Sequence, residues 1–170
     1  IGRPCDLKNK AFMIGQNSQF DTRLGIHGGA EVSIEANPED WADDRARELK
    51  AIGFNRVSFG VQSLDPVVLT ALGRAHSPEQ AARAVISARS AGFDTVGVDL
   101  IYGTPEESDT SWRRTVDRVL ALEPDHLSAY ALTVERGTAL SRSILAGAPA
   151  PDPDQQADRF EYAVSAAAEA

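Results

Sequence analysis

The chain has a single cysteine, Cys5, and a single methionine among its 170 residues. One cysteine excludes an intramolecular disulfide, and thiol-poor composition without disulfides is typical of a reducing compartment, so we expect a cytoplasmic location. No apolar run approaches the roughly 18 to 20 residues that a membrane span needs, and no basic patch followed by an apolar run marks a secretory signal. The sequence therefore predicts neither a disulfide-stabilised secreted domain nor a membrane span.

Positive charge is also scarce. The chain has 17 Lys and Arg residues against 25 Asp and Glu residues, which gives a formal net charge of -8. A surface that binds a nucleic-acid duplex normally carries a basic excess, so we expect no nucleic-acid partner. The apolar share of 42% and the charged share of 25% are ordinary for a globular protein of about one domain.

The first 30 residues differ in composition from the rest. They hold four basic and two acidic residues, a net charge of +2, whereas the remaining 140 hold 13 basic and 23 acidic residues, a net charge of -10. No helical or strand period runs through them for long. We divide the chain into an irregular segment, 1–30, and a folded region, 31–170. The segment is either a native arm or a stretch made foreign by truncation, fusion or a frame error, and the chain's two ends suggest a fragment.

Short β-rich runs alternate with helical patterns from residue 31 onward. The helices begin at recognisable signals, because Asn37-Pro38 and Asp65-Pro66 each place a capping side chain before a proline and Ser77–Gln80 forms a capping box. Repeating βα units predict parallel strands joined by right-handed crossovers. The four predicted strands are Glu31–Glu35, Arg56–Gln62, Thr95–Tyr102 and His126–Leu132.

A weak internal repeat supports the βα pattern. Residues 51–57 (AIGFNRV) and 90–96 (SAGFDTV) share Gly, Phe and Val at a shift of 39 residues. In each copy a helix ends at the glycine, and the phenylalanine can pack where the chain turns into the next strand. Such units build either a barrel or an open doubly wound sheet.

The two faces of the predicted strands differ in chemistry, and the difference favours a barrel. Side chains alternate between the faces of a strand, and one set is apolar while the other is small and then polar towards the strand ends. A sheet covered by helices on both faces would be apolar on both, whereas barrel enzymes place their sites at the carboxyl ends of the strands. The sequence thus predicts an α/β fold, a partial (β/α) barrel of about four βα units with a ligand in its lumen. The polar set comprises Ser33, Glu35, Ser58, Gly60, Gln62, Gly97, Asp99, Ser128 and Tyr130.

Three strand residues of the polar set are candidates for ligand binding. Asp99 lies within a strongly apolar strand, where an unpaired charge is costly, and a structural ion pair is the alternative. Glu35 ends its strand and could instead be a surface group, while Gln62 could cap the following helix. Arg74 follows a short helix and could reach back over the barrel mouth, although alone it would be one surface arginine among many.

No metal site or catalytic constellation can be argued from spacing. His27, His76 and His126 are isolated, without a second ligand at metal-like spacing. No Ser-His-Asp or Cys-His arrangement is indicated either. We therefore assign no catalytic residue and no metal ligand.

Five runs in the alternating region carry a family resemblance: EANPE (35–39), GFNRVSFGVQS (53–63), LGRAHS (72–77), GFDTVGVDLIYGTP (92–105) and PDHLSAYALTVERGT (124–138). In this order and spacing they resemble the radical S-adenosylmethionine (SAM) proteins of the oxygen-independent coproporphyrinogen III oxidase family, and more closely its haem-chaperone branch. The resemblance implies a partial barrel that holds SAM beside a [4Fe–4S] cluster. It also implies that Glu35, Gln62, Arg74 and Asp99 contact SAM and that Thr133 lies near its adenosyl end.

The chain departs from that family at three motifs. The CxxxCxxC cysteines that hold the cluster and the GGGTP run at the methionine end of SAM are missing, as is the later HNxxYW motif linked to haem. The resemblance therefore implies a fragment of a haem-chaperone-like protein that is inactive alone because the cluster ligands are absent, with haem or porphyrin as partner of the intact protein.

Two other functions remain open. One is an oxygen-independent coproporphyrinogen III dehydrogenase, which decarboxylates propionates by radical abstraction. The other is a metal-free barrel that acts as a binding or scaffold module. In each case the missing strands would leave open barrel edges, which invite association with another chain.

Overall fold

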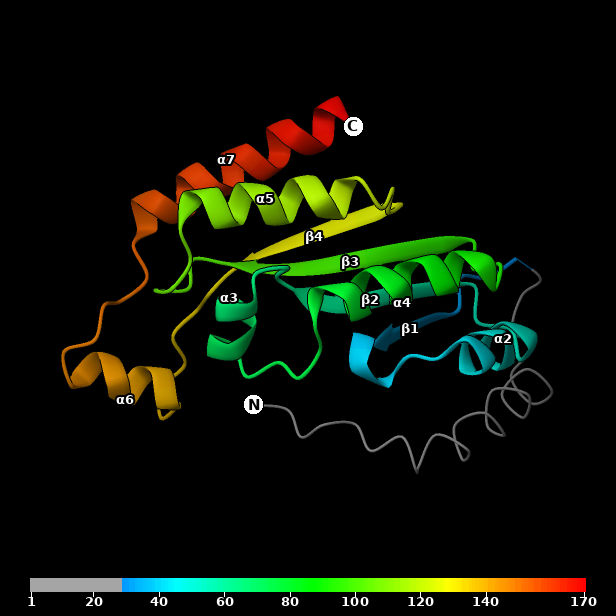
Figure 1. Ribbon diagram of the computed structural model, residues 1–170, viewed down its shortest axis with the longest axis horizontal. Helices are drawn as coiled ribbons and strands as arrows, with labels where there is room; N and C mark the ends of the chain where they lie inside the picture. The colour runs from blue at the N-terminus through cyan, green and yellow to red at the C-terminus, as the bar shows by residue number, and fades with distance from the viewer. Residues whose placement is uncertain (1–28) are drawn as a thin grey trace.

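The computed structural model describes residues 29–170, in which four strands alternate with helices (Figure 1). The strands form one sheet in the order β1-β2-β3-β4, and each neighbouring pair is parallel. Strands that follow one another in the chain are therefore neighbours in the sheet, as successive βα crossovers produce. This confirms the predicted α/β partial barrel. The elements are β1 (Ser33–Ala36), η2 (Pro38–Asp40), α2 (Asp43–Ala51), β2 (Arg56–Gln62), α3 (Pro66–Ala71), α4 (Pro78–Ser90), β3 (Thr95–Tyr102), α5 (Asp109–Leu120), β4 (His126–Ala131), α6 (Ala139–Leu145) and α7 (Pro153–Glu169).

The first βα unit differs in detail from the sequence prediction. β1 begins at Ser33 rather than at Glu31. Asn37 caps no α-helix, because only the 3-10 turn η2 follows it and α2 starts later, at Asp43. The Asn37 side chain has another partner, since its Oδ1 accepts a hydrogen bond from Arg74 Nη1 at 3.2 Å.

The other predicted helix starts are confirmed. The Asp65 carboxylate accepts from the backbone N–H of Val67 at 2.8 Å and caps α3. At the start of α4 the Ser77 hydroxyl accepts from Gln80 N at 3.3 Å, and Gln80 Oε1 accepts from Ser77 N at 2.8 Å. These bonds satisfy N–H groups that a helix terminus otherwise leaves without partners.

The internal repeat corresponds to neighbouring strands. Val57 and Val96, which are 39 positions apart, lie opposite each other in the register of β2 and β3. The two repeat glycines end α2 and α4 with φ values of 105° at Gly53 and 85° at Gly92, which side-chain-bearing residues rarely adopt. Phe93 is buried and its ring centroid lies 5.8 Å from that of Trp41. The repeat is therefore a structural unit with a shared turn.

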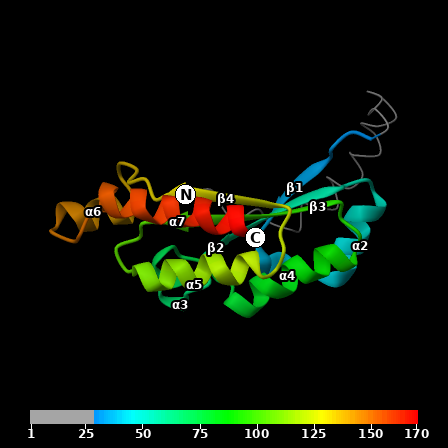
Figure 2. The same cartoon turned by 90° about the horizontal axis from the view of Figure 1, so that it is seen from above.

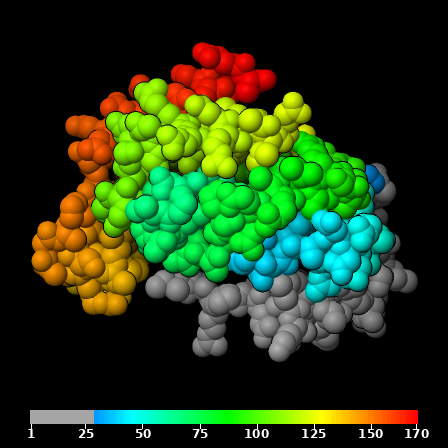
Figure 3. Space-filling model, viewed as in Figure 1, coloured from blue at the N-terminus to red at the C-terminus, as the bar shows by residue number. Residues whose placement is uncertain are grey.

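The core lies between the sheet and the helices on one of its faces. Figure 2 shows α4 and α5 on the same side of the strands, and in Figure 3 the helices α2 to α5 form most of the described surface on that side. Burying a large apolar side chain contributes roughly 1.5–3 kcal/mol, so this face supplies much of the folding free energy. The strand residues in this core are at most 2% exposed: Val57, Phe59, Val61, Val96, Val98 and Leu100.

The boundary that composition predicts at residue 30 falls at the edge of the described region, and residues 1–28 lie outside it. Among the described helices, none combines the length and the apolar composition that a membrane crossing requires.

Candidate functional site

The face of the sheet opposite α4 and α5 carries the polar set. Side chains of residues paired in register share a face of the sheet, so each row of partners projects together. The first row runs across all four strands, and the second lies one step nearer the carboxyl ends of the strands. The first row consists of Glu35, Ser58, Gly97 and His126, and the second of Gly60, Asp99 and Ser128.

Asp99 is oriented on this face by its neighbour in β2. The Ser58 hydroxyl donates to Asp99 Oδ2 at 3.0 Å. Gly97 makes this possible, because a Cβ at that position would lie 2.9 Å from Ser58 Oγ. Within residues 29–170 Asp99 has no ion-pair partner, so the structural salt bridge considered for it is not found there. The carboxylate is thus partly buried and fixed by one hydroxyl.

Gln62 and Arg74 converge at the ends of β1 and β2. A Cβ on Gly60 would lie 2.8 Å from Gln62 Nε2 and 3.6 Å from Asn37 Oδ1, so both side-chain amides lie over Gly60 on the polar face. The guanidinium of Arg74 donates to that same Asn37 oxygen. Gln62 does not cap α3, because Asp65 does.

Glu35 and Thr133 lie farther out. Glu35 is exposed on β1, directly opposite Ser58 in the register of β1 and β2. Thr133 is exposed beyond the end of β4, and its hydroxyl donates to the carbonyl of Ala131 at 3.5 Å. β1 and β4 are the outer strands of the described sheet, so these two residues flank the central group formed by Gln62, Arg74 and Asp99.

The spacing of residues in the sequence indicated no role for His76. The structure places it beside the group formed by Gln62, Arg74 and Asp99. Its side chain is completely buried, with Nε2 2.9 Å from the carbonyl oxygen of Val61 and Nδ1 3.0 Å from Glu39 Oε2. The signal in the sequence is the LGRAHS run itself, which contains both Arg74 and His76.

A buried ion pair lies behind the loop that follows β3. Glu107 Oε2 is 3.2 Å from Arg159 Nη1, with side-chain exposures of 0% and 5%, and also accepts from Gly103 N at 2.7 Å. Removal of the carboxyl from water raises the pKa of Glu107 to about 7, although the Gly103 N–H and the Arg159 charge oppose the shift. The pair joins α7 to the β3–α5 loop and is an anchor of the fold.

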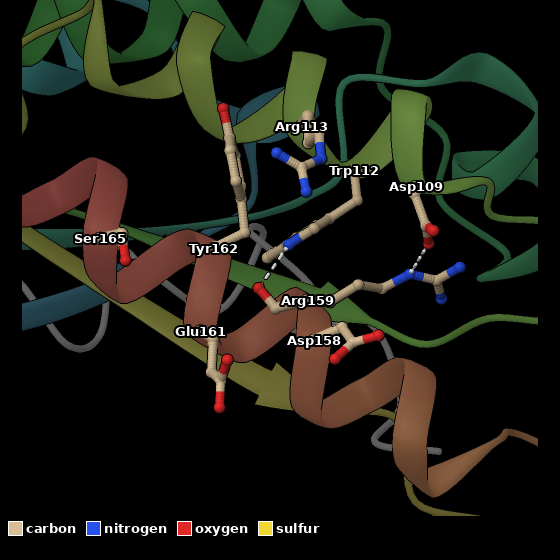
Figure 4. A pocket seen from close by; sticks show the side chains of 8 residues that line it. All are labelled: Asp109, Trp112, Arg113, Asp158, Arg159, Glu161, Tyr162 and Ser165. Carbon is tan, nitrogen blue, oxygen red and sulfur yellow. Dashed lines mark hydrogen bonds and ion pairs between the residues drawn. The ribbon is translucent and has the colours of Figure 1, made fainter.

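The groove between α5 and α7 has a volume of about 350 Å³ and is shown in Figure 4. Its polar groups bind one another, since Arg159 Nε donates to Asp109 Oδ1 at 3.2 Å and Trp112 Nε1 donates to the Arg159 carbonyl at 2.8 Å. The Arg113 guanidinium lies 4.2 Å from the centroid of the Tyr162 ring, a cation–π contact. These contacts hold α7 against α5, so we interpret the groove as part of the packing between the two helices.

In the part of the chain that the structure describes, no three His, Cys, Asp or Glu side chains are grouped so as to hold a metal ion. The side chains on the polar face offer hydrogen bonds and charge. Two carboxylates, an amide and a guanidinium can bind a small molecule with hydroxyl, ammonium and carboxylate groups.

Successive parallel βα units with one face under helices and one polar face define a barrel-type α/β protein with polar side chains at the strand ends. The radical SAM superfamily matches residues 6–119, more than half of the chain. The chain belongs to this superfamily, whose members in general use SAM and a [4Fe–4S] cluster.

Two relatives with haem-related names illustrate the match. The chain is 50% identical over 133 residues to the heme chaperone HemW of Mycobacterium tuberculosis strain H37Rv, covering 78% of this chain and 34% of that protein. It is 38% identical over 117 residues to the oxygen-independent coproporphyrinogen III oxidase of Pseudomonas aeruginosa, covering 66% of this chain and 25% of that one. The chain thus spans about a third or less of the length of these relatives.

Among solved structures, coproporphyrinogen III oxidase (HemN) from Escherichia coli, described as a radical SAM enzyme, superimposes with a TM-score of 0.81. The sequences are 30% identical, and the match covers 92% of this chain and 36% of that one. This likeness confirms the fold class and the resemblance to the coproporphyrinogen oxidase family.

Proposed function

We propose that this chain is the SAM-binding part of a haem-chaperone-like radical SAM protein of the cytoplasm. Its 50% identity over 133 residues to a HemW protein supports the chaperone branch. The observation that carries the SAM site is the convergence of Gln62, Arg74 and Asp99 on one polar sheet face.

The residues on this face fit the chemistry of SAM. The Asp99 and Glu35 carboxylates can accept hydrogen bonds from ribose hydroxyls and from the ammonium group. Arg74 can pair with the carboxylate of SAM, and the Gln62 amide can both donate and accept. Thr133 is assigned to the adenosyl end. Haem or porphyrin is assigned to the intact protein as a partner.

The residues of this chain alone cannot hold a [4Fe–4S] cluster. A SAM-binding [4Fe–4S] cluster takes three protein thiolates and keeps one iron for SAM, and Cys5 is the chain's only cysteine. In an intact relative the cluster supplies the electron that cleaves SAM. We derive no radical step for the chain by itself.

Calorimetric titration of the chain with SAM tests the proposed site. Loss of a charge-assisted hydrogen bond costs on the order of 2 kcal/mol, so Asp99→Ala should weaken SAM binding about 30-fold. Asp158→Ala, which removes an exposed carboxylate from α7, should leave the affinity unchanged. Equal affinities of the Asp99→Ala variant and the unsubstituted chain would remove Asp99 from the site, and an absence of SAM binding would favour a scaffold module.

A coproporphyrinogen III dehydrogenase is the second candidate, because the HemN likeness extends over 92% of the chain. A full-length protein that carries this sequence distinguishes the two. Stoichiometric haem binding without conversion of coproporphyrinogen III supports the chaperone, and conversion of coproporphyrinogen III under anaerobic conditions supports the dehydrogenase.

A further inference from the structure

The backbone turns sharply at Gln62, the last residue of β2. Gln62 has a φ of 65°, and Ser63 N donates to the carbonyl oxygen of Val61 at 2.8 Å, which closes a three-residue γ-turn. This turn, with a positive φ at its centre, is rare and strained for a non-glycine residue. The β2–β3 register also shifts between Gly60 and Gln62. Such a conformation persists only where the surrounding structure holds it.

His76 holds the carbonyl that closes this turn. The Val61 oxygen, which accepts from Ser63 N, also lies 2.9 Å from His76 Nε2. A carbonyl oxygen can only accept, so Nε2 carries a hydrogen and donates it. The peptide plane between Val61 and Gln62 is thereby fixed by two donors, one of them from a loop 15 positions along the chain.

The other nitrogen of the ring ties the same loop to the end of β1. His76 Nδ1 lies 3.0 Å from Glu39 Oε2, in the turn η2 that follows β1. Two positions before His76, Arg74 donates to Asn37, which directly precedes η2. The LGRAHS loop, residues 72–77, therefore joins the ends of β1 and β2 through two side chains.

We propose that His76 is a positioning residue, which holds the γ-turn at Gln62 so that the Gln62 carboxamide lies over Gly60 and faces bound SAM. His76 itself does not touch the ligand, since its ring is completely buried and both nitrogens are occupied within the protein. This inference rests on the proposed function for its ligand and on the hydrogen bonds above for the turn. A histidine that only filled the core would stabilise the fold without affecting Gln62.

Amide hydrogen exchange by NMR tests the turn without any ligand. His76→Phe keeps a ring of similar size but removes both hydrogen bonds, so the exchange of the Ser63 amide should accelerate at least tenfold and the Gln62 carboxamide resonances should shift. His76→Gln keeps an N–H donor and should restore part of the protection. His126→Phe, at an exposed histidine, is the matched control. An unchanged Ser63 amide in both His76 variants would overturn the proposal.

A double-mutant cycle with SAM tests the positioning role. His76→Phe, or His76→Gln if the first variant does not fold, should weaken SAM binding about tenfold by calorimetry when Gln62 is present. In a Gln62→Ala background the same substitution should leave SAM affinity unchanged, while stability in urea falls in both backgrounds. Equal losses of affinity in both backgrounds would overturn the proposal. If the unsubstituted chain does not bind SAM, the proposed function fails, and the claim that Gln62 faces SAM fails with it. The hydrogen-exchange experiment still tests whether His76 holds the γ-turn.

Discussion

Gln62 is the residue where backbone strain and the candidate site coincide. Its φ of 65° is unfavourable for any side chain with a Cβ, and its amide lies over Gly60 on the polar face. Strained residues cluster at ligand sites, where the surrounding structure holds a side chain in one direction. The strain at Gln62 is therefore what a binding role predicts.

The strain can be measured by comparing two truncations of the same side chain. Gln62→Ala keeps the unfavourable conformation, whereas Gln62→Gly relieves it, so the glycine variant should be more stable by about 1 kcal/mol in urea unfolding. At Glu48, in the middle of α2, the order should be reversed, because glycine costs roughly 0.5–1 kcal/mol relative to alanine in a helix. A Gln62→Ala variant more stable than Gln62→Gly would show that the turn carries no strain.

Helix α7 is the element that fixes the loop after β3. Besides the Glu107–Arg159 pair, Gln156 donates to the Leu132 carbonyl at 3.1 Å and packs against Gly103, where a Cβ would lie 2.5 Å from Gln156 Nε2. One face of α7 thus holds the ends of both β3 and β4. Helix α7, which lies outside the polar face, therefore supports β3, the strand that carries Asp99.

This anchor predicts a pH dependence of stability. The pKa of Glu107 is raised by burial from 4.5 to about 7, so the unfolded chain ionises at lower pH than the folded protein. As pH rises from 4.5 to about 7 the unfolded state is favoured, and the free energy of unfolding falls by about 3 kcal/mol. Below 4.5 the contribution is fully present, and above about 7 its loss is complete.

Urea unfolding of the Glu107→Gln variant at about pH 4.5 and about pH 8 checks this prediction. The variant should lack this part of the pH dependence and should gain stability relative to the unsubstituted protein as pH rises. Glu106→Gln, at the exposed neighbouring carboxyl, should follow the unsubstituted protein. Parallel pH profiles for all three proteins would contradict the raised pKa.

At the scale of the whole molecule, the barrel is open in the described part of the chain. β1 and β4 each have a strand neighbour on one side only within residues 29–170. The polar face is accordingly accessible, and Tyr130 on β4 is 58% exposed. Self-association through such edges stays a prediction.

The chain by itself should perform no radical chemistry. Anaerobic reconstitution with iron and sulfide should give substoichiometric iron, no EPR signal of a reduced [4Fe–4S] cluster and no 5′-deoxyadenosine from SAM, because one cysteine cannot supply three thiolates. A full-length relative with the three cysteines is the positive control. A stoichiometric cluster that cleaves SAM would refute the prediction.

The sequence by itself determined the order of the four strands and the start of two of the helices between them. Period-two runs and helix caps defined β2 and β3 at their observed bounds, and the capping box at Ser77 is local chemistry that any fold would keep. The alternation of apolar and polar residues also separated the two sheet faces, and on that basis singled out Asp99 and Gln62. The same argument selected Glu35. The position of Arg74 after a short helix made it a candidate, and the family resemblance added its contact with SAM and the place of Thr133.

Only the tertiary structure decided which distant side chains meet. The bonds of Asn37 with Arg74, of His76 with Val61, and of Glu107 with Arg159 join residues 15 to 52 positions apart. No local period encodes such contacts, because they depend on how loops close over strand ends. For the same reason the sequence predicts that Asn37 caps a helix, whereas in the fold its amide oxygen accepts a hydrogen bond from the Arg74 guanidinium.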